Sequence, residues 1–170
     1  MIIKKIEERA TQILSELGIN LFPIPILKIA KLLGVQIHQY DLGENISGVL
    51  VIKNDQGIIG VNPSESSVRQ RFTIAHELGH YMLHRNLNES IFVDREISVL
   101  FRSQNSSPGE LKREQEANAF AAAILMPKDM LLEQIQKNYI DITDEVALKG
   151  LAKKFDVSLI AMTIRVSNLS

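Results

Sequence analysis

The sequence contains no cysteine and no tryptophan, and only 5% of its 170 residues are aromatic. Without thiols the chain forms no disulfide, so a metal site in it must be built from histidine and carboxylate side chains. Its apolar stretches are interrupted within a few residues, so none is long enough to cross a bilayer, and no charged-then-apolar leader opens the chain. These absences predict a cytoplasmic protein without a membrane partner.

An excess of charge of one sign is also absent, because 19 basic and 20 acidic residues leave a net charge of −1. Such a balance gives no general attraction to a phosphate backbone, so direct nucleic-acid binding would need a local basic patch. What the chain does have is 45% apolar residues, enough to form one folded domain with a substantial core. We expect a single domain over residues 1–170.

One run, His76-Glu77-Leu78-Gly79-His80, carries the clearest chemical signal. In an α-helix, residues i and i+4 lie on one face, so His76 and His80 can each direct a ring nitrogen at the same ion. Glu77 lies beside them, where a carboxylate can take a proton from water that zinc acidifies and pass it to a leaving amine. The pattern is typical of zinc metalloproteases. The alternative is an amphipathic helix with a partly buried histidine pair and no metal.

A catalytic zinc ion usually has three protein ligands, so a third donor is needed. An alanine-rich run from Glu114 to Pro127 predicts a helix ended by proline, and its small side chains permit close approach to the first helix. Glu114 and Glu116 point about 200° apart on such a helix, so at most one of them can face the metal. We favour Glu114, which shares a face with Ala117 and Asn118. The alternative for Glu116 is a solvated surface carboxylate.

His84 also follows His80 at helical spacing. Three stacked imidazoles cannot close tetrahedrally around one ion without strain. We therefore interpret His84 as a packing or capping residue near the end of the helix.

The remaining sequence predicts a mostly helical α+β fold, with a small β-sheet packed beside an active-site helix that resembles that of zincins. The expected elements are helices near 3–17 and 25–34, a strand at 35–39, a hairpin of 48–52 with 58–61, and a C-terminal helical pair at about 143–168 after a catalytic core of about 1–135. The hairpin could offer an edge to an extended substrate, or it could be scaffold only. The polar segment 103–109 predicts a loop, either a lid or a plain connector.

The C-terminal helical pair imitates a helix-turn-helix, which raises DNA binding as a rival function. A recognition helix normally carries several side chains for phosphates or base edges. The second helix of this pair offers only Arg165 as a basic group. We therefore favour packing of this pair against the catalytic core or a partner.

Several runs together resemble the ImmA/IrrE family of metallo-endopeptidases. They are the segments 71–84, 114–121 and 125–127, within a likeness that covers roughly Ile6 to Arg165. The resemblance implies that His76, His80 and Glu114 are zinc ligands and that Glu77 is the catalytic base. It also implies a substrate, because family members are typically encoded beside a helix-turn-helix repressor and inactivate it by cleavage. The alternatives are a zinc-containing regulator that does not cut its partner and a DNA- or protein-binding module.

Overall fold

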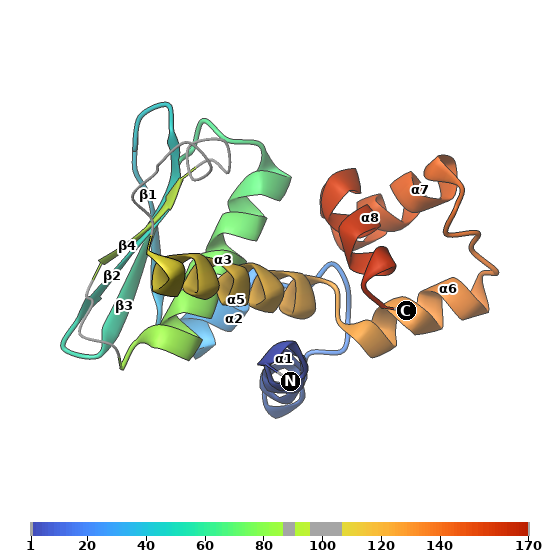
Figure 1. Ribbon diagram of the computed structural model, residues 1–170, viewed down its shortest axis with the longest axis horizontal. Coiled ribbons are helices and arrows are strands. Elements are labelled where there is room, and N and C mark those ends of the chain that lie inside the picture. The colour runs from blue at the N-terminus through green and yellow to red at the C-terminus, as the bar shows by residue number, and fades with distance from the viewer. Residues whose placement is uncertain (1, 87–90, 96–106, 170) are drawn as a thin grey trace.

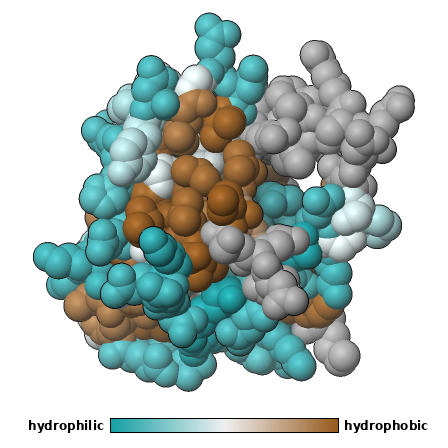
Figure 2. Space-filling view, turned by 90° about the vertical axis from the view of Figure 1, so that its left-hand side faces the viewer, coloured by the Kyte–Doolittle hydropathy of each residue, from teal (hydrophilic) through white to brown (hydrophobic). Residues whose placement is uncertain are grey.

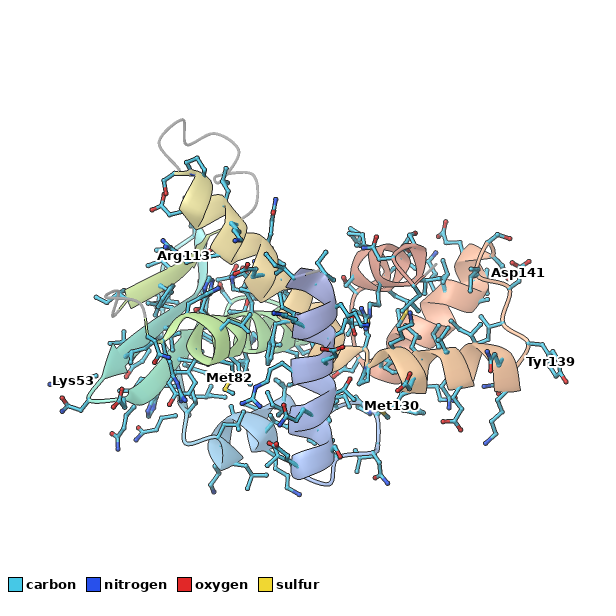
Figure 3. All side chains as sticks on the ribbon, turned by 60° about the horizontal axis from the view of Figure 1, so that its bottom comes forward. Lys53, Met82, Arg113, Met130, Tyr139 and Asp141 are labelled. Carbon is cyan, nitrogen blue, oxygen red and sulfur yellow. The ribbon has the colours of Figure 1, made fainter. Side chains whose placement is uncertain are left out.

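The computed structural model describes residues 2–86, 91–95 and 107–169. The helices are α1 (Ile2–Glu16), α2 (Ile26–Leu32), α3 (Ser67–His84), α5 (Pro108–Leu125), α6 (Lys128–Lys137), α7 (Glu145–Phe155) and α8 (Leu159–Ser167). The strands are β1 (Gln36–Gln39), β2 (Ile46–Lys53), β3 (Gln56–Val61) and β4 (Ile91–Arg95). The sheet lies at one end of the molecule, α6 to α8 lie at the other, and α3 and α5 connect them (Figure 1). Lys53 and Tyr139 mark the two ends (Figure 3). The predicted fold class is confirmed.

The four strands of the sheet lie in the order β1-β3-β2-β4, with β1 parallel to β3 and the other pairs antiparallel. Both hairpin strands are therefore interior: Val49 of β2 pairs with Gly60 on one side and with Val93 on the other. The hypothesis that the hairpin offers an edge to a substrate is wrong, because neighbouring strands occupy the two edges of the hairpin. The sheet face away from α3 is apolar, with Ile91 59% exposed (Figure 2).

Helix α3 carries the histidine motif and packs on the inner face of the sheet. Ser66 caps its first turn by accepting a hydrogen bond from the Arg69 backbone N–H. Strand β2 approaches the helix closely at Gly48, where an added Cβ would lie 2.3 Å from Thr73 Cγ2 and 3.6 Å from Glu77 Cγ. Only glycine leaves room there, so the sheet closes directly over Glu77.

Helix α5 begins earlier than the sequence predicted. Ser107 and Glu110 form a reciprocal capping box, and Pro108 occupies the first turn, where its missing N–H costs nothing. Assigning residues 108–109 to a loop was therefore wrong, whereas Ser107 lies outside the helix as its N-cap. Residues 103–106, the remainder of the suggested lid, lie outside the described residues.

The C-terminal helices pack against the core through Arg165. This side chain is buried, its Nε donates to the Met126 carbonyl at 2.9 Å, and its Nη2 lies 3.0 Å from Glu7 Oε2 on α1. Arg165 is the basic residue that a recognition helix would have had to present to DNA. Its charge is instead paired within the protein. Among the described residues, no helix is both long and apolar enough to cross a membrane.

Candidate metal centre

The site depends on a close approach of α3 and α5. A Cβ added at Gly79 would lie 3.2 Å from the backbone of Ala117 and 3.2 Å from Phe120 Cβ, so these two helices meet almost backbone to backbone. Ala117 lies at the contact. Glu114, three residues earlier, is displaced by only about 60° around α5, so its side chain can reach across to the motif face of α3.

His76, His80 and Glu114 converge at one point. The Nε2 atoms of the two histidines are 3.1 Å apart, and each lies 3.1 Å from an oxygen of Glu114. Metal–ligand bonds of about 2.0–2.1 Å in tetrahedral geometry put ligand atoms roughly 3.3 Å apart, so small side-chain shifts would admit one ion. Two imidazoles and one carboxylate form a donor set that suits zinc. The structure thus brings together the three residues predicted as ligands.

The surroundings shift the pKa values of His80 and Glu114. Both histidines are buried, and burial is the main cause that lowers the pKa of His80 below its ordinary value. Burial alone would raise the pKa of Glu114, but hydrogen bonding and the charges of His76 and His80 lower it to about 2. At neutral pH these shifts favour a neutral imidazole at His80 and an ionised carboxylate at Glu114.

Glu77, the predicted base, is fully buried at 0% exposure. It follows His76 directly in α3, and its Cγ faces the backbone of Gly48 in β2. The sheet and helix therefore hold this carboxylate out of bulk solvent, one residue after the candidate ligand His76.

The second ring nitrogen of His76 also has a partner. His76 Nδ1 lies 2.9 Å from Asn118 Oδ1, so the N–H of the ring can be donated to the amide oxygen while Nε2 faces Glu114. Such contacts fix the orientation and tautomer of a ligand histidine. Asn118 was expected on this face of α5, one turn after Glu114.

His84 is a packing residue at the end of α3, as predicted, whereas Glu116 differs from its sequence interpretation. His84 is buried, its Nδ1 lies 3.2 Å from His80 Nδ1, and its Nε2 lies 2.9 Å from Glu116 Oε2. The side chain of Glu116 is only 19% exposed, so its assignment as a solvated surface carboxylate is wrong. The reason is the position of Ala117 at the helix contact: Glu114 and Glu116 flank it on opposite sides, and both reach α3.

One contact could not have been found from sequence. The ring of Phe92, on β4, stacks on the ring of His80 with centroids 4.8 Å apart. The contact depends on how β4 pairs with β2 and on where that sheet lies over α3, neither of which leaves a local signal in the chain.

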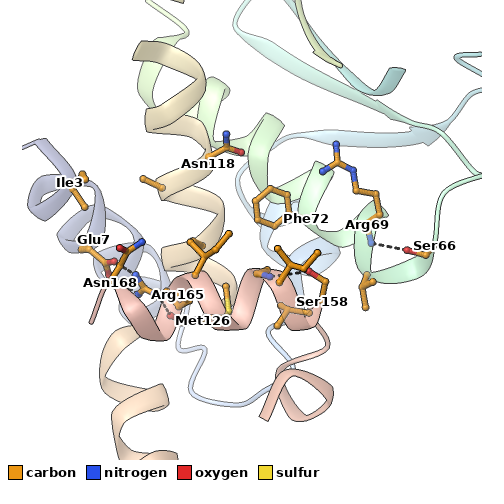
Figure 4. A pocket seen from close by; sticks show the side chains of 17 residues that line it. Ile3, Glu7, Ser66, Arg69, Phe72, Asn118, Met126, Ser158, Arg165 and Asn168 are labelled. Atoms are coloured by element: carbon orange, nitrogen blue, oxygen red, sulfur yellow. Dashed lines mark hydrogen bonds and ion pairs between the residues drawn. The ribbon is translucent and has the colours of Figure 1, made fainter. Parts of the chain in front are cut away.

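An apolar groove of about 650 Å³ lies between α1, α3, α5 and α8, and Asn118, the partner of His76, is among the residues that line it (Figure 4). On α3 its wall includes Phe72, one turn before His76, and on α5 it includes Asn118 and Ala122, one and two turns after Glu114. The groove thus follows the same helix faces that carry the candidate ligands. Its other apolar walls come mainly from Ala119, Met126, Ile160 and Ile164.

The close helix contact leads to a prediction. We expect Gly79→Val to lower the free energy of unfolding by about 1–3 kcal/mol, because the added side chain overpacks against Ala117. Zinc affinity should fall as well, since the two helices supply different ligands. Gly150→Val in α7 is the matched control, because that position is open, and it should change stability by less than about 0.5 kcal/mol. Urea unfolding measures the change in the free energy of unfolding for the two variants. Equal effects at the two positions would contradict the close-approach argument.

The chain is similar in sequence to known metallopeptidases. The family model of the IrrE N-terminal-like domain, a peptidase family, matches residues 30–167. Metallopeptidase ImmA of Bacillus subtilis is 30% identical over 134 residues, which cover 78% of this chain and 69% of that protein. The radiation response metalloprotease IrrE of Deinococcus radiodurans is 33% identical over 104 residues, which cover 61% of this chain but only 29% of that protein.

The solved structures add a likeness in fold. A transcriptional regulator of Mycobacterium tuberculosis superposes with a TM-score of 0.65 at 17% identity. The match covers 96% of this chain and 47% of the regulator, so this chain spans about half of that protein.

Proposed function

Because this chain belongs to the IrrE N-terminal-like family of metallopeptidases, we propose that it is a zinc-dependent endopeptidase with His76, His80 and Glu114 as metal ligands. The observation that carries this proposal is the convergence of these three side chains, whose ligand atoms lie within 4.8 Å of one another. They come from two helices that are distant in sequence and that meet at a glycine–alanine contact. The His/His/Glu donor set supports zinc as the ion.

The proposed reaction is hydrolysis of a peptide bond. A zinc ion, when bound, acts as a Lewis acid that polarises the scissile carbonyl and acidifies water. Glu77 takes the proton of the attacking water and returns it to the leaving amine as the C–N bond breaks. Burial of Glu77 under β2 keeps this proton within the site, and Asn118 holds the ring of His76 in one orientation.

We propose a helix-turn-helix repressor as the substrate, which would place the activity in the cytoplasm. The likeness of the motif runs to the ImmA/IrrE family supports this choice. The test is incubation of the zinc-loaded protein with the repressor encoded beside its gene, followed by mass spectrometry of new N-termini. One new N-terminus that requires Glu77 is the expected result. Derepression that is equal for wild type and Glu77→Gln would instead favour a regulator that binds without cutting.

The groove lined by Asn118 and Ala122 is proposed to receive apolar side chains on one side of the scissile bond. Ala122→Phe would narrow it, and we expect kcat/KM for peptides with a large apolar residue there to fall about 10- to 200-fold. Zinc content should not change. Val146→Phe is the control, because Val146 is 74% exposed on α7. A peptide library with one varied position on each side of the cleaved bond measures the effect. Unchanged selectivity in Ala122→Phe would exclude the groove as a subsite.

A further inference from the structure

We infer that His84 and Glu116 are positioning residues for the metal centre: Glu116 orients His84, and His84 in turn orients the ring of His80. The inference rests on the proposed metal site and not on peptide hydrolysis. Its basis is a continuous line of contacts from α5 to α3. Glu116 Oε2 lies 2.9 Å from His84 Nε2, and His84 Nδ1 lies 3.2 Å from His80 Nδ1.

The protons along this line can be ordered in only one way when Nε2 of His80 serves as a metal ligand. That nitrogen then carries no proton, so the proton of the neutral ring is on Nδ1 and must be donated. The atom that accepts it is His84 Nδ1. The proton of His84 is consequently on Nε2, where the carboxylate of Glu116 accepts it. Each nitrogen and the carboxylate oxygen thus has a single, compatible role.

The surroundings hold these groups in place. His84 is 5% exposed, and the ring of Phe92 stacks on His80 at 4.8 Å and lies 6.5 Å from the ring of His84. The other oxygen of Glu116 faces Lys112, whose Nζ is 4.0 Å away and whose side chain is 61% exposed. That contact is long and solvated, so it contributes little to holding the Glu116 side chain in place. The directed interaction of Glu116 is the one with His84.

The two ligand histidines are therefore oriented in different ways. His76 has the neutral amide of Asn118 at 2.9 Å, whereas His80 is linked to a carboxylate through a second imidazole. A carboxylate at the end of such a line increases the basicity of the ligand, and its loss typically weakens metal binding about 10- to 100-fold. The same i+4 spacing that makes His84 unsuitable as a third ligand makes it suitable as the partner of His80.

The test is the zinc Kd of the full chain, measured by competition with a chromogenic chelator and without any substrate. His84→Leu removes the acceptor, and we expect its Kd to rise about 10- to 100-fold. His84→Asn places an amide oxygen near the former Nδ1 and should recover most of the affinity. Glu116→Gln keeps an acceptor without charge and should lie between them. Lys112→Ala is the control and should bind like wild type.

Two further readouts separate positioning from a general loss of structure. The thermal unfolding of the zinc-free variants reports packing, and the visible absorption of the cobalt-substituted proteins reports ligand geometry. We expect His84→Leu to alter the cobalt spectrum and His84→Asn to restore it. Wild-type affinity in His84→Leu would overturn the inference, as would equal weakening in both His84 variants. Zinc that survives Glu114→Ala would instead show that the proposed site itself is wrong.

Discussion

Replacing Glu77 with glutamine is expected to lower kcat about 10²- to 10⁴-fold while the chain keeps its fold and its zinc. Glutamine has the shape of glutamate but cannot accept a proton from the attacking water. It therefore removes the base without opening a cavity under β2, where Glu77 is fully buried. Steady-state cleavage of a peptide that spans the repressor cleavage site measures the effect, and elemental analysis shows that zinc remains.

The matched control is Glu133→Gln, the same change at an exposed position of α6. It should cleave at the wild-type rate. KM should change little in Glu77→Gln, because the lost interaction is made in the transition state and not with the bound peptide. Cleavage by Glu77→Gln at the wild-type rate would show that another group is the base.

Glu114→Ala is expected to raise the zinc Kd by more than the roughly 10- to 100-fold that loss of an outer partner costs. The carboxylate supplies the one negative charge among the candidate ligands, and each of its oxygens lies 3.1 Å from a ligand nitrogen. Without it, two neutral imidazoles remain, which is one ligand fewer than a catalytic zinc site normally has. Chelator competition measures the Kd.

Gln115→Ala is the control for Glu114→Ala, because Gln115 is the exposed neighbour on the same helix. It should bind zinc like wild type. Comparison with Glu116→Ala also decides whether Glu114 or Glu116 of α5 is the third ligand. If Glu116→Ala loses zinc and Glu114→Ala keeps it, the assignment of the third ligand must be reversed.

The sequence predicted those parts of the site that depend on one helix. The placement of His76 and His80 on one face follows from their spacing, and the face of α5 that carries Glu114 and Asn118 follows from the same periodicity. The structure brings all four side chains together.

The sequence did not predict the parts that depend on how elements cross. Whether Glu116 reaches α3 depends on which residue lies at the helix contact, and that residue is Ala117. The stacking of Phe92 on His80 depends on the register of β4 against β2. The position of the hairpin inside the sheet depends on which strands flank it. Helix spacing and turn residues carry no information on the helix contact, the strand register or the strand order.

The most direct test of a zinc site at His76, His80 and Glu114 is the zinc content per chain, determined by elemental mass spectrometry. The protein is purified without chelator, offered zinc and then desalted. We predict one zinc per chain in the wild type and almost none in Glu114→Ala. Absence of zinc from the wild type after this treatment would contradict the account and leave a binding module without hydrolytic chemistry.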